Sequence, residues 1–129
     1  MSTVNKTVSP ANMRELAEKM IDFLSKNEFW FQMIIYVDNE AWYSEPKNDT
    51  EKHLTKKKGN DYYVKTDMDV KDYLEYNNPD TISLVFEGPL YHKINYEDYD
   101  YVSKLSEKFL KPYGLYFEQG YAWSITAYK

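Results

Sequence analysis

The stretch EFWFQMIIYVDNEAWYSE, residues 28–45, decides how the rest of the chain is expected to fold. From Phe29 to Val37 its mainly apolar, aromatic and β-branched side chains occupy both alternating faces, which is typical of a central strand covered on both sides. Asp38 and Asn39 tolerate the left-handed backbone of a tight turn, so residues 40–45 are predicted to return as an antiparallel strand. The stretch therefore predicts a hairpin in the middle of a sheet.

The flanking segments predict helices and further strands. Ser9 can cap the free amides of a helix and Pro10 gives up an N–H without a partner, and apolar residues then recur at helical spacing as far as Leu24. Residues 90–96 are compatible with either a short extended piece or a helical turn. In chain order we predict a helix over 10–26, strands over 28–37, 40–45 and 61–66, a helix over 67–76, a strand over 81–87, a helix that starts near 97 and ends before Pro112, and strands over 115–118 and 121–128.

This order, α-β-β-β-α-β-α-β-β, predicts an α+β fold in a single domain over residues 1–129. Short links between neighbouring strands force antiparallel pairing, so we expect an antiparallel or mixed sheet of five or six strands, with two or three helices packed mainly on one face. Residues 1–8 are expected to be disordered. Residues 46–60 contain almost no apolar side chains and are expected to form a mobile basic loop.

Composition limits the class of protein. With 43% hydrophobic and 29% charged residues, the chain has enough apolar side chains for one core. No apolar run approaches the roughly 18 residues of a membrane helix, and the start MSTVNKTVSP does not resemble a secretory signal. Cysteine is absent, which excludes disulfides and thiolate chemistry. These features predict a cytoplasmic protein.

Groups for catalysis are scarce. The chain has two histidines, His53 and His92, and neither lies in a metal-binding or catalytic motif. Phosphate-binding glycine loops and serine-nucleophile motifs are also missing, so we predict a protein that is not an enzyme and has no cofactor or metal. The alternative is a small enzyme with a site near His92, in which Glu97 or Asp98 would be its partner.

The formal net charge of −5 is unevenly distributed. Residues 46–60 carry five lysines against two acidic residues, whereas the rest of the chain is acidic. One acidic cluster lies on the predicted helix 67–76 and a second lies near residue 98 among tyrosines, whose rings and polar tips make good interface anchors. A solvated helix face is the plain alternative. The predicted partner-binding residues are Asp67, Asp69, Asp72, Glu75, Glu97, Asp98, Asp100, Tyr96, Tyr99 and Tyr101.

Two segments of the C-terminal part, TISLVFEGPLYHKINY (residues 81–96) and YGLYFEQGYAWSITAY (residues 113–128), carry a resemblance. In these segments the chain resembles small proteins carried by bacterial phages and other mobile elements. The resemblance implies a protein that acts by binding and blocking another protein, for example a restriction or CRISPR nuclease, or a toxin.

Charge and resemblance together favour one hypothesis for function. We expect an acidic binding protein of the anti-defence, anti-CRISPR or immunity type, which inhibits or regulates a basic, nucleic-acid-handling partner. Nucleic acid itself is the less favoured partner, because an acidic body repels phosphates. The alternative is a nucleic-acid-binding protein that uses tyrosine stacking and the basic loop, with Lys47, Lys52, Lys56, Lys57 and Lys58.

Overall fold

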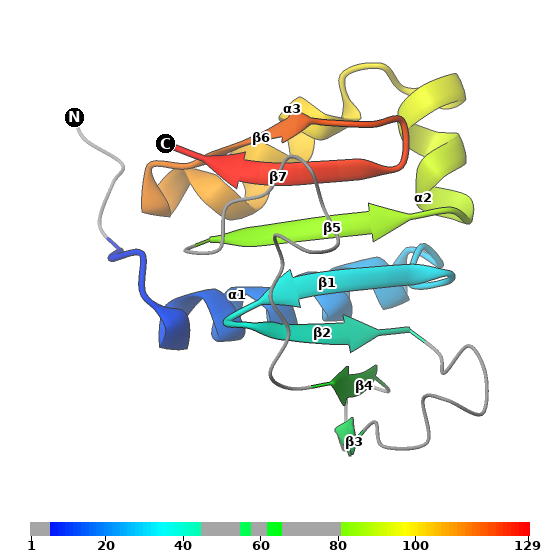
Figure 1. Cartoon of the computed structure of the whole chain (residues 1–129). Helices are drawn as coiled ribbons and strands as arrows, with labels where there is room; N and C mark the ends of the chain where they lie inside the picture. Colours follow the sequence, from blue (N-terminus) through cyan, green and yellow to red (C-terminus); the bar gives the residue numbers. More distant parts are fainter. Residues whose placement is uncertain (1–5, 45–54, 58–61, 66–80) are drawn as a thin grey trace.

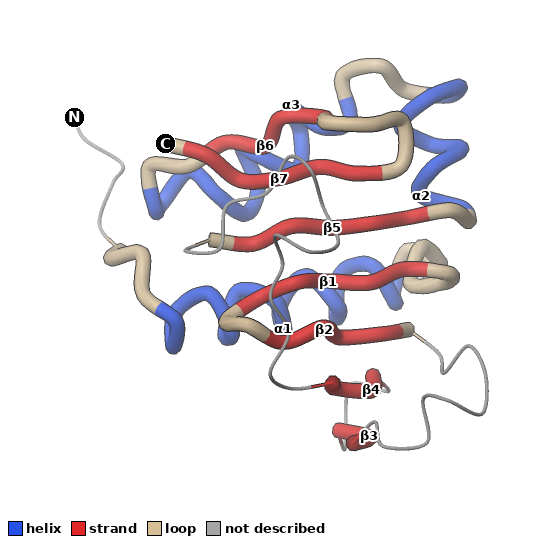
Figure 2. Tube along the Cα trace, in the orientation of Figure 1, coloured by secondary structure: helices blue, strands red, loops and turns tan. Residues whose placement is uncertain are grey.

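The computed structural model describes residues 6–44, 55–57, 62–65 and 81–129, and its centre is a seven-stranded antiparallel sheet (Figures 1 and 2). The two central strands, β1 and β5, are in register, with Ile35 opposite Leu84. The sheet order is β3-β4-β2-β1-β5-β7-β6. The strands are β1 (Met33–Val37), β2 (Glu40–Tyr43), β3 (Thr55–Lys57), β4 (Tyr62–Lys65), β5 (Ile82–Phe86), β6 (Tyr116–Gln119) and β7 (Ser124–Tyr128).

In the view of Figure 1, α1 and α3 lie behind the sheet and α2 lies at its right-hand end. The longest, α1, begins at Pro10, and the Ser9 hydroxyl accepts a hydrogen bond from the Asn12 N–H at 3.2 Å, as the sequence predicts. The remaining helical segments include two π-helical turns, η3 and η4. The helical segments are α1 (Pro10–Lys26), α2 (Pro89–His92), η3 (Lys93–Glu97), α3 (Tyr101–Leu105), η4 (Ser106–Leu110) and the 3-10 turn η5 (Lys111–Tyr113).

The main core lies between the helices and one face of the sheet. Its sheet side consists of alternate residues, such as Ile35 on β1 and Leu84 on β5, which are fully buried. The residues between them on β1, Ile34 and Tyr36, belong to a second and smaller buried cluster with Tyr43. The strand β1 is therefore buried on both faces, and the predicted α+β fold with an antiparallel sheet is confirmed.

The predicted strand over 28–37 is wrong in its first five residues. The strand β1 begins at Met33, because Glu28 and Gln32 adopt left-handed backbone angles, with φ of 62° and 53°, that an extended strand does not allow. Between them the Phe31 N–H bonds to the Phe29 carbonyl at 2.7 Å and closes a tight turn. As a result Trp30 enters the main core, whereas the Phe31 side chain is 61% exposed.

Other differences concern segments that the sequence left without regular structure. The strand β3 lies inside the stretch 46–60. It pairs with β4 and is a seventh strand of the sheet. The Lys6 N–H bonds to the Pro112 carbonyl at 3.0 Å and Val8 packs on the core, although both lie in the stretch expected to be disordered.

Residues 90–96 are helical, and the predicted helix 67–76 lies outside the described residues. Among the described helices none is both long and apolar enough to cross a bilayer.

Candidate interaction surface

Two predicted tyrosines are displayed on the turn between η3 and α3, which we call the tyrosine turn (residues 96–101). The Tyr99 side chain at its tip is 82% exposed and that of Tyr96 is 62% exposed. Tyr101 is half-buried, and its ring meets the Phe29 ring edge-on at a centroid distance of 5.8 Å. The turn is therefore anchored to the core at one end and offers two phenol rings to solvent.

The Asp98 carboxylate organises the tyrosine turn. One of its oxygens lies 2.6 Å from Lys104 Nζ, and the other accepts a hydrogen bond from the Asp100 N–H at 3.1 Å. The Lys104 hydrogen bond, followed by the Asp100 N–H, lowers the pKa of Asp98. The Asp98 N–H closes the π-helical turn η3 by bonding to the Lys93 carbonyl at 2.8 Å. Asp98 is thus a structural residue of the turn, and Lys104 neutralises its charge.

The other two predicted carboxylates of this turn are not in ion pairs, although the charge of Asp100 helps to raise the pKa of Lys104. The side chains of Glu97 and Asp100 are exposed, and neither forms an ion pair with any described residue. The tyrosine turn therefore combines two exposed tyrosines with two unpaired carboxylates. The structure brings together this half of the predicted site.

The other half of the predicted site lies outside the described part of the chain. This holds for the acidic residues of the predicted helix 67–76 and for most of the predicted basic loop, of which β3 contains Lys56 and Lys57. Their part in binding stays a prediction. The residues outside are Asp67, Asp69, Asp72, Glu75, Lys47, Lys52 and Lys58.

Next to the tyrosine turn lies a group of aromatic residues, of which only Tyr96 was among the predicted binding residues. The rings of Tyr121 and Trp123 stack in parallel, 4.7 Å apart and 2° from coplanar, and Trp123 is 43% exposed. The Tyr91 and Tyr96 rings lie 6.1 Å apart, and a side-chain hydrogen bond between the two residues raises the pKa of Tyr91. We call Tyr91, Tyr96, Tyr121, Trp123 and Phe31 the aromatic end surface. They come from α2, η3, the β6–β7 turn and the segment before β1, which share one end of the sheet, at the right of Figure 1.

Asn95 joins two parts of the aromatic end surface. Its side-chain amide donates to the Tyr91 carbonyl at 2.9 Å and to the Ala122 carbonyl at 2.8 Å. Its oxygen accepts a hydrogen bond from the Gln119 amide at 3.2 Å. These contacts attach the β6–β7 turn to η3, so both pairs of rings are held by the same framework.

Phe31 is held at this end by backbone contacts. The Glu87 N–H bonds to the Gln32 carbonyl at 3.1 Å. A Cβ atom at Gly88 would lie 2.8 Å from the Phe31 carbonyl oxygen, so only glycine allows this approach without movement. Left-handed backbone at non-glycine residues is costly, and such strain is often found at functional sites. Here two left-handed residues, Glu28 and Gln32, flank an exposed phenylalanine.

The alternative enzyme site near His92 does not form in the predicted way. The His92 side chain is exposed, and its ring lies 5.2 Å from the Tyr96 ring. No hydrogen bond or ion pair joins it to Glu97 or Asp98, since the oxygens of Asp98 contact Lys104 and Asp100. Within the described ranges, no three histidine or acidic side chains converge as metal ligands.

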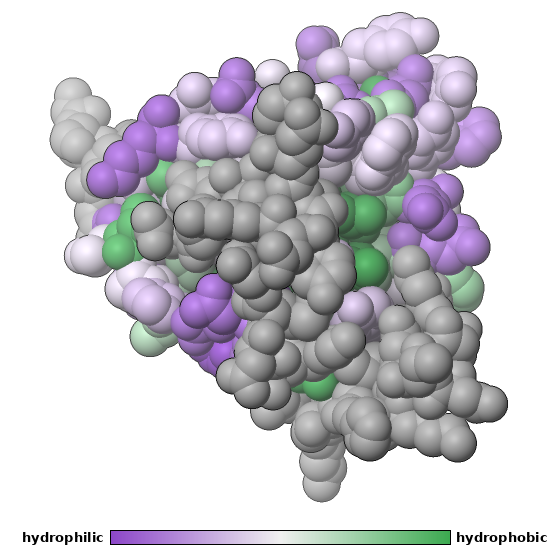
Figure 3. All heavy atoms as spheres, in the orientation of Figure 1, coloured by the Kyte–Doolittle hydropathy of each residue, from purple (hydrophilic) through white to green (hydrophobic). Residues whose placement is uncertain are grey.

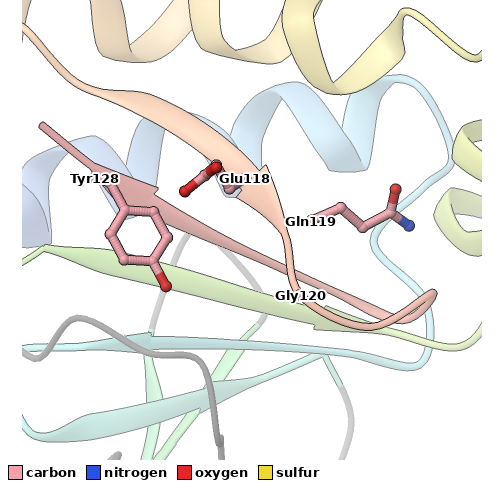
Figure 4. Close-up of a pocket in the computed structure, with 4 residues that line it drawn as sticks. All are labelled: Glu118, Gln119, Gly120 and Tyr128. Atoms are coloured by element: carbon pink, nitrogen blue, oxygen red, sulfur yellow. The ribbon is translucent and has the colours of Figure 1, made fainter.

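Two hollows on the surface offer little for a ligand. The first, about 250 Å³, lies on β6 and β7 and includes Glu118, Gln119, Gly120 and Tyr128 in its lining (Figure 4). Its volume is below the roughly 300 Å³ that is usual for ligand pockets. The second, about 440 Å³, lies beside η4, where Glu107 and Lys111 already pair with each other at 3.2 Å. In Figure 3 the visible upper right of the molecule is coloured mainly as hydrophilic.

The single arginine has a structural role. Arg14 on α1 forms ion pairs with Glu40 and, at 3.5 Å, with Asp38, and it stacks over the Trp42 ring at 5.4 Å. Partial burial lowers its pKa and the Glu40 hydrogen bond raises it, with a net rise. Trp42 Nε1 also donates to Glu40 at 2.9 Å. The arginine that phosphate recognition would favour is thus occupied at the α1–hairpin contact.

Comparison with known proteins gives no match: no protein-family model, no curated protein and no solved structure is similar to this chain.

Proposed function

We propose that the chain is a non-enzymatic acidic binding protein that inhibits or regulates a basic, nucleic-acid-handling partner protein. The observation that carries this proposal is Tyr99, 82% exposed at the tip of an ordered turn between the unpaired carboxylates of Glu97 and Asp100. Tyrosine is among the residues that most often dominate binding energy at protein interfaces. A large exposed tyrosine with such neighbours fits a protein contact.

The order of the tyrosine turn supports a role in binding. The Tyr101 N–H bonds to the Asp98 carbonyl at 3.1 Å, and the Lys104 N–H bonds to the Asp100 carbonyl at 3.0 Å. Together with the two contacts of the Asp98 carboxylate, these bonds fix the loop before any partner arrives. A preformed loop loses less conformational entropy on binding than a flexible one.

Charge indicates the class of partner. Proteins that handle nucleic acids neutralise phosphates with lysine and arginine, so they present basic surfaces. An acidic surface is attracted to such a protein and competes with its nucleic acid. The net charge of −5 and the free carboxylates of Glu97 and Asp100 suit this contact.

Capture of partners on the immobilised full-length chain tests the proposal. A lysate of the organism that encodes the chain is passed over wild type, Tyr99→Ala, the double variant Glu97→Gln/Asp100→Asn, and the control Tyr116→Ala, which removes an exposed tyrosine 44% accessible on β6. We expect basic proteins on wild type and on the control, with losses on both other variants. The purified partner should then bind more weakly as salt rises, and its nucleic-acid activity should fall when the chain is added.

Two results would overturn the proposal. The first is a set of captured proteins that are not basic, or that remain bound equally well to Tyr99→Ala. The second is a purified partner whose affinity does not change between low and high ionic strength.

A further inference from the structure

The aromatic end surface is built differently from the tyrosine turn. Phe31 is 61% and Trp123 43% accessible, and the segments that carry its five aromatic residues lie at one end of the sheet. Large aromatic rings exposed together on a small protein commonly mark a binding site. The same end also contains η3, a π-helical turn, and such turns are frequent at functional sites.

Among the described residues at this end of the sheet, acidic side chains outnumber basic ones. Glu28, Glu87 and Glu97 are exposed next to members of the aromatic end surface, and none of them pairs with a described cation. Of the lysines in the described segments at this end, Lys93 lies over the Tyr101 ring at 5.4 Å, whereas Lys26 at the end of α1 is exposed. Aromatic faces beside free carboxylates attract cations, and they repel phosphate groups.

Arginine fits this surface better than lysine does. Its guanidinium group is planar and weakly hydrated, so it can stack on a ring while its N–H groups bond to a carboxylate. The chain contains one example of this arrangement, since Arg14 stacks over Trp42 while it pairs with Glu40. The ammonium group of lysine is more strongly hydrated and cannot stack in this way.

We propose that the aromatic end surface binds an arginine-rich segment of a protein partner, with Trp123 and Phe31 as stacking platforms and Glu87 and Glu97 as carboxylate acceptors. This inference rests on the proposed function, which supplies the basic protein partner, whereas the preference of the surface for arginine can be tested by itself. It adds the chemistry that the partner must present and the residues that would recognise it.

Tryptophan fluorescence provides the first test, because Trp30 and Trp42 are buried and Trp123 is exposed. The full-length wild-type chain is titrated with hexa-arginine, with hexa-lysine and with a short single-stranded oligo-dT. We expect hexa-arginine to quench or shift the emission, hexa-lysine to bind several-fold more weakly, and oligo-dT to have no effect. Trp123→Phe should remove most of the spectral change.

Calorimetry provides the second test. Trp123→Ala should weaken hexa-arginine binding about two- to tenfold, the range expected for loss of one cation–π contact. Tyr116→Ala is the matched control, since it removes an exposed ring at the opposite end of β6 and should leave the affinity unchanged. Circular dichroism checks that each variant is folded. The comparison of the three ligands uses the wild-type chain alone, so it does not depend on the folding of a variant.

Equal affinity for the two peptides, an unchanged affinity of Trp123→Ala, or a response to oligo-dT in place of hexa-arginine would overturn the inference. The two proposals can fail separately. If a captured basic partner is lost by Tyr99→Ala and retained by Trp123→Ala, the inference alone is wrong. If hexa-arginine binds at Trp123 but no basic protein is captured, the proposed function alone is wrong.

Discussion

The Ser106 hydroxyl lies 2.8 Å from the backbone nitrogen of Phe117 and accepts its hydrogen bond. Phe117 belongs to β6, an outer strand of the sheet, and it faces Ala127 of β7 on the other side. The same hydroxyl donates to the Val102 carbonyl at 3.0 Å. The turn η4 thus occupies a donor that an edge strand would otherwise offer to another chain.

Ser106→Ala should lower the free energy of unfolding by about 1–2 kcal/mol, because the partly buried Phe117 N–H loses its acceptor. Urea denaturation measures this change. Ser103→Ala is the control, since Ser103 is exposed and its hydroxyl has no hydrogen bond to a described residue, so its effect should be close to zero. Equal effects of the two substitutions would contradict the role given to Ser106.

The two buried tryptophans should respond differently to the same substitution. Trp42→Phe breaks the bond to Glu40 and disturbs the stack on Tyr62, whose ring centroid lies 4.6 Å away, so we expect a loss of roughly 2–4 kcal/mol. Trp30 Nε1 is buried and has no acceptor among the described residues. Trp30→Phe removes that unpaired donor along with some packing, and the net loss should be about 1 kcal/mol or less.

Urea denaturation of both variants gives the comparison. If Trp30→Phe proves as destabilising as Trp42→Phe, the Trp30 N–H must have a partner that stabilises the protein.

The Asp98–Lys104 pair should make stability depend on pH at both extremes. The folded pKa of Asp98 is below its ordinary value of 3.8, so its contribution is present above pH 3.8 and is lost as the pH falls through the folded pKa. The folded pKa of Lys104 is above 10.5, mainly because of its hydrogen bond to Asp98, so its contribution is present below pH 10.5 and is lost above the folded pKa.

Asp98→Asn should therefore be less stable than wild type at neutral pH, and the difference should shrink as the pH falls below 3.8. Thermal unfolding at a series of pH values measures this. Glu107→Gln, at the exposed Glu107–Lys111 pair, serves as the control, because such surface pairs contribute little. A difference between Asp98→Asn and wild type that persists unchanged in acid would argue against the ion pair.

Gly88→Ala should destabilise the protein by about 1–3 kcal/mol, because the new methyl group would meet the Phe31 carbonyl oxygen and push the two segments apart. Phe31→Ala separates the ring from the backbone. It removes an exposed side chain without a clash and should change stability little. Thermal unfolding of the two variants measures both effects, and a fully stable Gly88→Ala would show that the 27–32 segment can move freely.

The sequence predicted the elements whose local signals agree with their environment. The cap at Ser9 and the apolar spacing from Met13 to Leu24 are sufficient for α1, and alternation is sufficient for β5. The first residues of the predicted strand 28–37 are wrong for a specific reason. Their aromatic side chains alternate as a strand would, but Glu28 is left-handed where α1 ends, with its N–H bonded to the Ser25 carbonyl. Gln32 contacts the segment at Glu87 and Gly88, far away in the sequence.

The candidate site was predicted only in part, for a similar reason. Acidic and aromatic residues near position 98 indicated the tyrosine turn, but the pairing of Asp98 with Lys104 depends on the relative position of η3 and α3. Trp123 and Phe31 were not predicted to share a surface, because they are 92 positions apart in the sequence. Sheet order brings their segments to one end, and only the folded chain shows it.

The contacts of Asn95 have one more consequence. Because a single amide holds both the β6–β7 turn and the Tyr91 carbonyl, the gap between the two pairs of rings is set by the protein before anything binds. A ligand that spans them must match a fixed length. The surface would then discriminate between ligands by the spacing of their cationic groups more than by the total number of these groups.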